Sequence, residues 1–476
     1  MFIYKVEKTK NKDILYYSIL VLLVICIAFS LKTNAWNKEV IGVDSSVFVS
    51  IGEKMHEDEI PYKDVFDHKG PILYFINYIG TFSSNYLLLQ LIETAFLMFD
   101  AVLLFKISNR ILNNKLMSLF ATVLSTLTFP FVLQGGNFAE EYALPFVLLS
   151  LLIFLKNVQT GKDYMINGIL LGIVVLLKFN MISVWCVGYL FILINRIYKK
   201  EYKNIVKMVG CSLLGFIVSI VPSIIYLLVN GAFEDFINQY IIFNLKYSTS
   251  SDISVINFIY NNRILFYIPG FILAMNLYQI FKFKNNKEYR KNLMFSLLFF
   301  VITIATVIMP RNAYLHYWLG LIPCYIIPIS YFTKNIKNVR DEVILAITTL
   351  LIICIFVFAR NMQFADVVYP NSLYKISERI EDITYKDEDV LVLGNHLIIN
   401  LLTERTTNCK YIYQSPISDV DKNIKHEVEV YIRNNLPDII VFAHYDEYFE
   451  KLIYELIEKQ IYYVDSVCDA VIIKKE

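Results

Sequence analysis

Long apolar runs separated by short charged segments dominate this chain. Six of the runs carry almost no charge, and each approaches or reaches the roughly 17–25 residues that cross a bilayer core of about 30 Å. They cover residues 14–31, 86–105, 206–229, 264–281, 293–309 and 343–358. A soluble protein with this many buried helices would need a larger core than single domains usually build. The pattern therefore predicts a mostly α-helical, polytopic membrane protein.

Weaker apolar runs lie between these six and raise the expected number of transmembrane helices to about eleven. The predicted spans are residues 14–31, 86–105, 116–133, 141–155, 165–177, 180–195, 206–229, 264–281, 292–309, 314–332 and 343–359. The short spans at 141–155 and 165–177 are the weakest. Losing one of them would invert the sidedness of every later segment, whereas losing both would preserve it.

Positive charge divides the connections between these spans into two alternating sets. One set is rich in Lys and Arg and comprises the N-terminus and residues 106–115, 156–162, 196–203, 282–291 and 334–340. The other set, near residues 134–140, 178–180, 230–263 and 310–313, holds few cations. Under the positive-inside rule the first set is cytoplasmic. We therefore expect a multi-pass protein of the cell membrane, with a cytoplasmic N-terminus and a first outer loop at 32–85.

The composition shifts towards charge after about residue 360. Short apolar runs at 389–394, 438–443 and 470–474 alternate with amphipathic stretches at 421–435 and 446–459. This alternation is typical of a small α/β domain. We expect a transmembrane catalytic domain over residues 1–359, followed by an extracytoplasmic α/β domain over residues 360–476.

Overall composition excludes one class of function. The chain has 476 residues, of which 56% are hydrophobic and 18% are charged, and its formal net charge is +1. This balance offers no basic surface for nucleic acid. The seven cysteines show no CxxC or metal-type spacing and are interpreted as small hydrophobic residues.

Asp44 is the first candidate for chemistry, because it follows the first span directly in a segment that resembles an interfacial helix. Its carboxylate could act as general base on an acceptor hydroxyl, or hold a divalent cation that bridges a phosphate. The alternative is a helix N-cap, a role for which Asp is well suited.

Lys69 lies in the motif Asp67-His68-Lys69-Gly70-Pro71, immediately before an apolar segment. A lysine at that depth can meet a lipid phosphate as a compact point charge, or it can extend to ordinary headgroups. His68 could relay protons. Asp67 could simply balance the charge of Lys69.

Further ionisable residues lie on the same predicted outer face. Glu140 and Glu141 form an acidic pair that could bind a cation, or that could complement the dipole of a helix N-terminus. Lys178 is either a topological stop or a second cation that faces a cavity. Arg311 and His316 lie in an aromatic turn, where Arg suits phosphate binding and the aromatic residues also suit a membrane interface.

The first outer loop resembles that of GT-C glycosyltransferases, in particular the bacterial protein mannosyltransferase and aminoarabinose transferase group. The residues that carry the resemblance are Asp44, Gly52, Pro61, Tyr62, Asp64, Asp67, His68, Lys69, Gly70, Pro71 and Tyr74. The similarity covers roughly the first 330 residues in arrangement, but only the first loop in motif. One departure is Ser45, which stands where many members have a second acidic residue.

The resemblance implies a GT-C-like membrane glycosyltransferase that moves a sugar from a polyprenyl-phosphate donor to an acceptor at the outer face. The acceptor would be a lipid, a polysaccharide or a protein. In the roles that the resemblance implies, Asp44, with Glu140 or Glu141 as the second acidic residue, would be catalytic. Donor phosphate and substrate would be bound by Lys69, His68, Tyr62, Lys178, Arg311 and His316.

The same resemblance allows a divalent cation, Mg or Mn, held by Asp44 and Glu141. A transporter or flippase for a lipid-linked sugar is an alternative, but it predicts charges at mid-membrane and repeated halves. A polysaccharide polymerase or ligase is another alternative, and it would carry its charges in a large central loop. The charged loop of this chain follows the first span, which favours the transferase.

Overall fold

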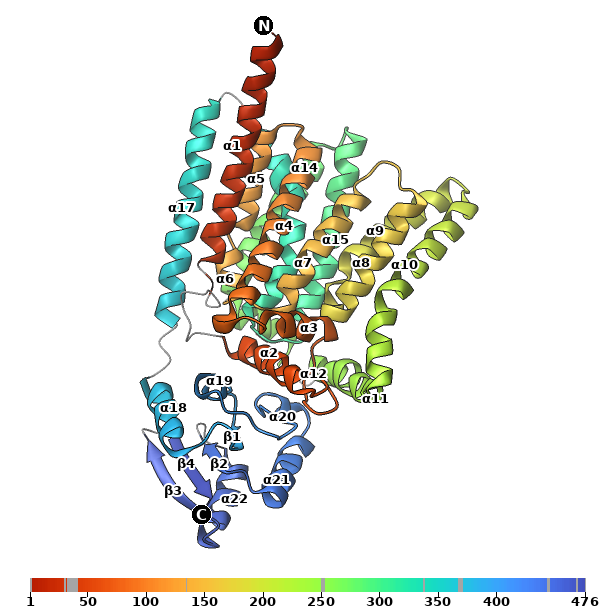
Figure 1. Ribbon diagram of the computed structural model, residues 1–476. Coiled ribbons are helices and arrows are strands. Elements are labelled where there is room, and N and C mark those ends of the chain that lie inside the picture. Colours follow the sequence, from red (N-terminus) through yellow and green to blue (C-terminus); the bar gives the residue numbers. More distant parts are fainter. Residues whose placement is uncertain are drawn as a thin grey trace.

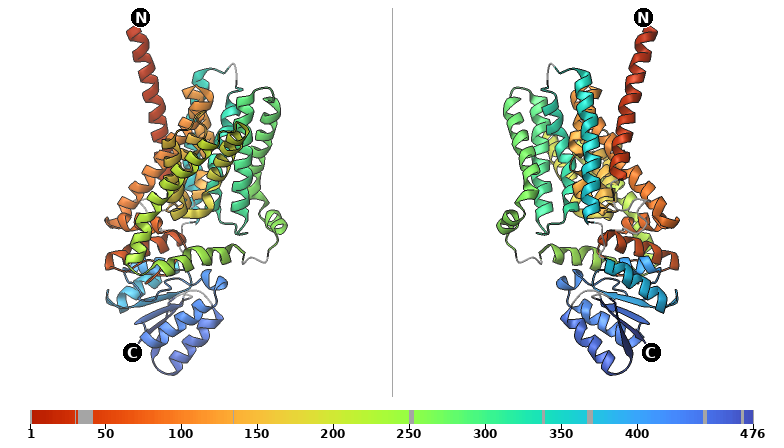
Figure 2. Two further views of the ribbon diagram at one scale, coloured as in Figure 1. Left: turned by 90° about the vertical axis from the view of Figure 1, so that its right-hand side faces the viewer. Right: turned by 90° about the vertical axis from the view of Figure 1, so that its left-hand side faces the viewer.

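The computed structural model describes residues 2–29, 31, 42–133, 135–249, 253–336, 339–366, 371–442, 446–467 and 470–475. Upright helices form a bundle, short helices lie across one end of it, and an α/β domain is attached below them (Figure 1). The N-terminus and the C-terminal domain lie at opposite ends of the molecule in both side views (Figure 2). Part of the predicted first outer loop, residues 32–41, falls outside the described residues.

The long helices coincide with the apolar runs of the sequence. They are α1 (Phe2–Ala28), α4 (Leu87–Leu112), α5 (Lys115–Thr126), α7 (Ala139–Phe154), α8 (Gly161–Lys178), α9 (Ser183–Tyr198), α10 (Tyr202–Val229), α14 (Tyr267–Lys282), α15 (Lys287–Ile308), α16 (Ile322–Thr333) and α17 (Asp341–Asp366). Leu, Ile, Val and Phe face both neighbouring helices and the outer surface of the bundle, as expected for helices surrounded by lipid.

Among the described residues, seven helices are long and apolar enough to cross a membrane. The predicted count of about eleven is therefore not confirmed. The helices α7 and α9 have 16 residues each and span only about 24 Å, short of a bilayer core of about 30 Å. Their roles as spans stay predictions.

Shorter helices lie in the connections between the long helices at the lower end of the bundle (Figure 1). They are α2 (Val43–Lys54), α3 (Pro71–Gly80), α6 (Phe129–Leu133), α11 (Phe233–Phe236), α12 (Asn244–Thr249) and α13 (Val255–Asn261), with the 3₁₀ helices η1 (Met55–Glu57), η2 (Ser84–Tyr86), η3 (Phe179–Met181), η5 (Arg263–Phe266) and η6 (Leu315–Leu321), and the π-helix η4 (Ile237–Phe243). Of these, α2, α3 and α12 lie across the lower end of the bundle, next to the C-terminal domain (Figure 1).

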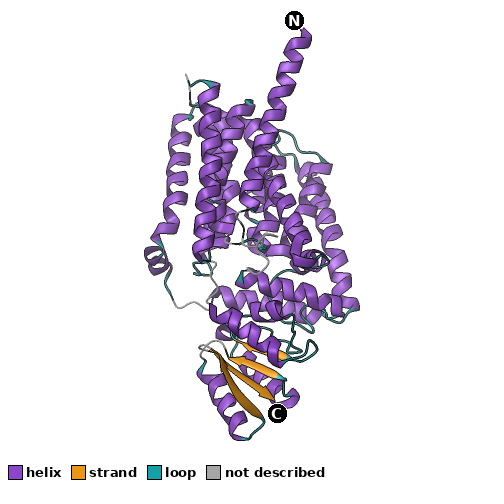
Figure 3. Cartoon of the chain, turned by 60° about the vertical axis from the view of Figure 1, so that its left-hand side comes forward, coloured by secondary structure: helices purple, strands orange, loops and turns teal. Residues whose placement is uncertain are grey.

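The C-terminal domain is a four-stranded sheet with helices around it, and the described strands gather only there (Figure 3). Its strands are β1 (Val390–Leu393), β2 (Ile439–Phe442), β3 (Tyr462–Val467) and β4 (Ala470–Lys475), in the order β1-β2-β4-β3. The pair β1–β2 is parallel, and the two remaining pairs are antiparallel. Its helices are α18 (Asn371–Ile383), α19 (Ile398–Thr403), α20 (Ile417–Val420), α21 (Asn423–Asn435) and α22 (Glu447–Glu458).

The α/β character that the sequence predicted is present, with one strand more than expected. Strand β3 was not predicted, because its sequence alternates Tyr, Val, Asp and Ser without an apolar run. The two parallel strands are continuous apolar runs because both faces of the sheet are covered.

The described part of the segment between α1 and α4 packs directly on this domain. Val49 of α2 is buried in one apolar cluster with Val390 and Ile398 of the C-terminal domain. The backbone N–H of Phe66 also donates to the carbonyl of Lys410 at 2.8 Å. These contacts fix α2 and the loop after it between the bundle and the domain.

Candidate active site

The loop that carries Lys69 is held by its own tyrosine. Tyr62 has a positive φ of 73°, is fully buried, and donates from its hydroxyl to the Lys69 carbonyl at 2.7 Å. Gly70 follows where a Cβ would meet the carbonyl oxygen of Leu176 at 2.0 Å, so only glycine fits. Tyr62 therefore shapes the loop from within, and no substrate could reach it without displacing packed side chains.

Two amide side chains from the 237–244 segment complete the support of this loop. Gln239 donates to the Tyr62 carbonyl at 2.6 Å, and Asn244 donates to the His68 carbonyl at 2.7 Å. Both partners are backbone oxygens of the loop, so the π-helix and α12 fix its path without occupying the side chains of His68 and Lys69.

Asp67, His68 and Lys69 form a chain of polar contacts. Lys69 Nζ lies 2.8 Å from His68 Nε2, and His68 Nδ1 lies 3.4 Å from Asp67 Oδ1. These distances fit a neutral imidazole that accepts from the ammonium at Nε2 and carries its proton on Nδ1, facing the carboxylate. Tyr74 and Tyr413 donate to the two oxygens of Asp67 at 2.8 and 2.6 Å.

Burial governs the charges in this chain of contacts. Burial lowers the pKa of Lys69 from its ordinary value; Asp67 opposes this effect, Lys178 adds to it, and Asp44 and Glu140 also oppose it. Burial, helped by Lys69 and Lys178, holds the pKa of His68 well below its usual value. An anion that entered the site would stabilise the charged lysine, because it would replace the water that burial removed.

A cavity of about 200 Å³ lies beside Lys69. Its lining residues come from α2, the Lys69 loop, the 247–317 region and the C-terminal domain: Val43, Asp44, Val47, Phe48, Asp67, His68, Lys69, Tyr247, Tyr314, His316, Tyr317, Asn395, Tyr413 and Pro416. The cavity therefore joins Asp44, His68, Lys69 and His316, four residues that the sequence singled out.

Asp44 lies in the first turn of α2 with its side chain 42% exposed. The alternative of an N-cap is wrong: the capping position is Gly42, and Asp44 lies inside the helix. Its Oδ2 lies 4.0 Å from Nε2 of His316, whose ring stacks on Phe138 at 4.2 Å. A carboxylate that is held at a cavity wall and still reached by solvent is suited to accept a proton.

Asn137 fastens α2 in this position. Its buried amide donates to Ser45 Oγ at 2.8 Å and to Asn77 Oδ1 at 2.7 Å, and its own oxygen accepts from the Tyr142 hydroxyl at 2.9 Å. The residue adopts a positive φ of 62°, which Asn tolerates better than most residues. The serine after Asp44 is thus a structural hydrogen-bond partner.

Glu140 and Lys178 form a buried ion pair at 2.9 Å. Lys178 Nζ also lies 4.8 Å from the ring centre of Tyr317, which lines the cavity. Lys178 is thus the cation of an ion pair beside the cavity wall, and its role in substrate binding stays a prediction. Neither Glu140 nor Lys178 lines the cavity wall. The pair therefore acts on the cavity through its contact with Tyr317 and through its electrostatic field.

Glu141 and Arg311 lie outside the cavity lining. Glu141 is fully buried one position beyond Glu140, and Arg311 occupies a left-handed turn with φ 54° after α15. Their predicted roles in catalysis and phosphate binding stay predictions.

The residues around Asp44 do not fit a resident divalent cation. Among the described residues no group of three or more His, Cys, Asp or Glu side chains could hold a metal ion. Of the two predicted ligands, Asp44 lines the cavity and Glu141 does not, while the Glu140 carboxylate is already paired with Lys178.

Several residues of the site were missed at the level of sequence. Asp67 was interpreted as charge balance, yet it is buried and accepts from two tyrosines. Asn395 and Tyr413 come from the C-terminal domain, more than 300 residues from Asp67, and no local pattern connects them to the loop. Tyr314 and Tyr317 belong to the aromatic turn whose Tyr and Trp faces the sequence predicts to suit either sugar rings or a membrane interface.

The bundle, the helices across its end and the attached α/β domain define the fold of a multi-pass membrane protein. Solved structures of ArnT, an aminoarabinose transferase, share it. ArnT from Cupriavidus metallidurans bound to undecaprenyl phosphate superimposes with a TM-score of 0.65 and 11% identity, over 97% of this chain and 98% of that chain. The apo form of the same protein gives a TM-score of 0.57, with 11% identity and 98% coverage of both chains.

Sequence comparison places the chain in a family. Residues 3–345 match the family model described as the competence-induced protein Ccs4 N-terminal domain, and the chain belongs to this family. No curated protein matches the chain.

Proposed function

We propose that this chain is an integral-membrane glycosyltransferase that takes its sugar from a polyprenyl-phosphate donor and transfers it to an acceptor hydroxyl on a glycan, lipid or protein. The observation that carries the proposal is the cavity that brings together a half-buried lysine, Lys69, and a partly exposed carboxylate, Asp44. A fold shared with a protein solved in complex with undecaprenyl phosphate supports the choice of donor.

The reaction is a single displacement at the anomeric carbon. The acceptor oxygen forms the new glycosidic bond as the bond from the anomeric carbon to the phosphate oxygen breaks, which inverts the configuration. Asp44 takes the proton of the acceptor hydroxyl, and the prenyl phosphate leaves with the electron pair of the broken bond. A second carboxylate at the sugar is not required, because phosphate is already a good leaving group.

Lys69 stabilises the charge that develops on the leaving phosphate. His68 orients the ammonium of Lys69, and Asp67 orients His68 in turn. The hydrogen-bond donor that faces the leaving phosphate is therefore preorganised. Tyr314 and Tyr317 offer ring faces at the cavity wall that suit a sugar. The ion pair of Glu140 and Lys178 adds a fixed field behind Tyr317.

A binding and transfer assay tests the proposal. Purified full-length chain in nanodiscs should bind undecaprenyl phosphate, and membranes that contain it should release prenyl phosphate from a labelled prenyl-phosphate sugar in step with a labelled product. Failure to bind the prenyl phosphate, or sugar release that always yields free sugar, would contradict a transferase.

We propose further that the site faces outward, as the charge of the loops indicates. Lys63 is exposed in the first loop, and Lys284 is exposed between α14 and α15. In intact cells an impermeant thiol reagent should label the Lys63→Cys variant above the parent background and leave Lys284→Cys at background. The opposite pattern would place the catalytic loop in the cytoplasm.

Chelation tests whether a metal takes part. Because the donor set around Asp44 does not fit a cation, EDTA should leave the transfer rate within about twofold of the untreated rate. Loss of activity that Mg²⁺ or Mn²⁺ restores would show that Asp44 binds a metal after all.

A further inference from the structure

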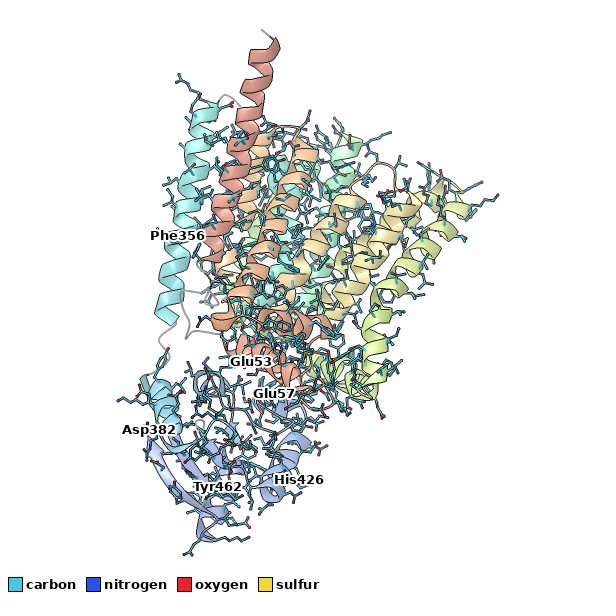
Figure 4. All side chains as sticks on the ribbon, in the orientation of Figure 1. Glu53, Glu57, Phe356, Asp382, His426 and Tyr462 are labelled. Carbon is cyan, nitrogen blue, oxygen red and sulfur yellow. The ribbon has the colours of Figure 1, made fainter. Side chains whose placement is uncertain are left out.

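A second and larger cavity lies between the first outer loop and the C-terminal domain. Its volume is about 640 Å³, within the range of about 300–1,000 Å³ that is usual for small-molecule sites. It is lined by the end of α2 with η1, by the 81–86 segment, and by α19 with the loop that follows it. Figure 4 shows Glu53 and Glu57, which line it, at this junction.

This cavity adjoins the one that contains Asp44 and Lys69. Phe48 and Tyr413 line the catalytic cavity, the one that contains Asp44 and Lys69. Ser50 and Ile412, close to them in the chain, line the second cavity. Along α2 the distance from Asp44 to Glu53 is about 13 Å. Residues nine positions apart lie on opposite sides of a helix, so an acceptor of several rings would pass beside α2 to reach Asp44 from the second cavity.

Hydroxyl and amide groups dominate the lining. The polar residues without charge are Ser50, Thr81, Ser83, Asn85, Tyr86, Asn400, Thr406 and Thr407. Such groups both donate and accept hydrogen bonds, as sugar hydroxyls do. Leu397, Leu401, Leu402 and Ile412 add a smaller apolar part, and the ring of Tyr86 adds a flat face.

Two of these polar groups are buried without a partner. The Ser50 side chain is 8% exposed and Asn400 is 5% exposed, and within the described chain Ser50 Oγ and Asn400 Oδ1 make no hydrogen bond. The amide nitrogen of Asn400 is already used, since it donates to the carbonyls of Val390 and Arg405 at 2.8 and 3.2 Å. Buried polar atoms normally have partners, and both of these atoms belong to residues of the cavity lining.

Charge in the cavity is acidic. Lys54 pairs with Glu59 at 2.7 Å, and the Arg405 guanidinium donates to Thr384 and to the carbonyl of Thr403. The lining also carries the carboxyls of Glu53, Glu57 and Glu404, of which Glu404 pairs with Lys386, so three carboxyls stand against the two cations Lys54 and Arg405.

Glu53 shows the effect of this crowding. Burial raises its pKa to about 7; the hydrogen bond from Tyr86 opposes the shift, and Glu404 and Glu57 add to it. The protonated Glu53 carboxyl can donate a hydrogen bond to an uncharged ligand. A bound ligand with an amine would instead favour the ionised carboxylate of Glu53.

The excess of carboxyls over cations in the lining favours a neutral or cationic ligand over a second prenyl phosphate. A peptide would need apolar anchor pockets that this lining does not provide. We propose that the cavity binds a glycan that is uncharged or amine-bearing, and, resting on the proposed function, that it holds the acceptor of the transfer.

The first test uses one substitution that fills the cavity and one matched control. Thr406 is exposed on the loop and lines the cavity, whereas Asn408, two positions later, is exposed and does not line it. Full-length chain in nanodiscs should bind maltotetraose or chitosan tetrasaccharide saturably, measured by thermophoresis. Thr406→Trp should weaken this binding at least tenfold, and Asn408→Trp should leave it unchanged.

Charge reversal provides the second test. Glu57→Lys should weaken binding of chitosan tetrasaccharide about tenfold, and Glu458→Lys, on exposed α22, should not. The inference is overturned if neither tetrasaccharide binds at millimolar concentration, if the two tryptophan variants behave alike, or if tetragalacturonate or an oligolysine peptide binds more tightly.

Titration with undecaprenyl phosphate separates this inference from the proposed function. Lys69→Ala should weaken binding of the prenyl phosphate and leave binding of the tetrasaccharides intact. Prenyl phosphate binding without glycan binding would refute the acceptor cavity alone. Glycan binding without prenyl phosphate binding would refute the transferase and the acceptor role with it.

Discussion

Asp44→Asn should lower the transfer rate by about 10²–10⁴-fold, the usual contribution of a general base. The variant keeps the shape of the side chain and removes its ability to take a proton. Since the Asp44 side chain is 42% exposed and its nearest charged partner is His316 at 4.0 Å, folding and membrane insertion should not change. Single-turnover transfer from a labelled donor measures the loss, and binding of undecaprenyl phosphate should stay within a few-fold of the parent.

Asp58→Asn is the matched control for this variant. Asp58 is an exposed residue of the same loop with φ 64°, a conformation that Asn adopts readily. The Asp58→Asn variant should transfer the sugar at the parental rate. Near-normal turnover of Asp44→Asn would remove the assignment of the base.

Lys69→Ala should weaken binding of the prenyl-phosphate donor by about 10–100-fold. A hydrogen bond to a charged group contributes about 1.5–3 kcal/mol, and each 1.4 kcal/mol is a factor of ten in Kd. Lys63→Ala is the control, because Lys63 is an exposed lysine of the same loop whose ammonium donates to the Asn230 carbonyl at 3.3 Å. A donor Kd unchanged by Lys69→Ala would contradict the phosphate contact.

The pH dependence of donor binding follows from the same lysine. Burial lowers the pKa of Lys69, and phosphate binding needs the protonated form. Donor affinity should therefore fall as the pH rises through this lowered pKa, at a lower pH than an ordinary lysine would give. Lys69→Arg stays charged above pH 12, so its affinity should not fall in that range. An identical alkaline fall in both proteins would show that another group titrates.

The sequence predicted the part of the site that is local in the chain. Asp44 lies on a short interfacial helix, and His68 and Lys69 lie on a loop closed by Gly70 and Pro71, so spacing and residue type sufficed to select them. Charge alternation between loops likewise put Lys178 on the same face as Glu140.

The remaining parts depend on tertiary contacts that no local pattern contains. The ion pair of Glu140 and Lys178 forms because the first turn of α7 meets the end of α8. Asp67 is part of the site because Tyr413 reaches it from the C-terminal domain. Spacing could not separate Glu140 from Glu141 either, since only the packing of α7 decides which of the two faces Lys178.

Tyr413, Asn395 and Pro416 close one wall of the catalytic cavity, yet all three lie beyond residue 345, where the match to the family model ends. The segment by which relatives are recognised is thus shorter than the segment that makes a complete catalytic centre. Truncation after α17 would leave Asp67 without one of its two tyrosine donors and the reaction chamber open on one side. Among relatives, retention of the tail should therefore distinguish working enzymes from chains that keep only the membrane scaffold.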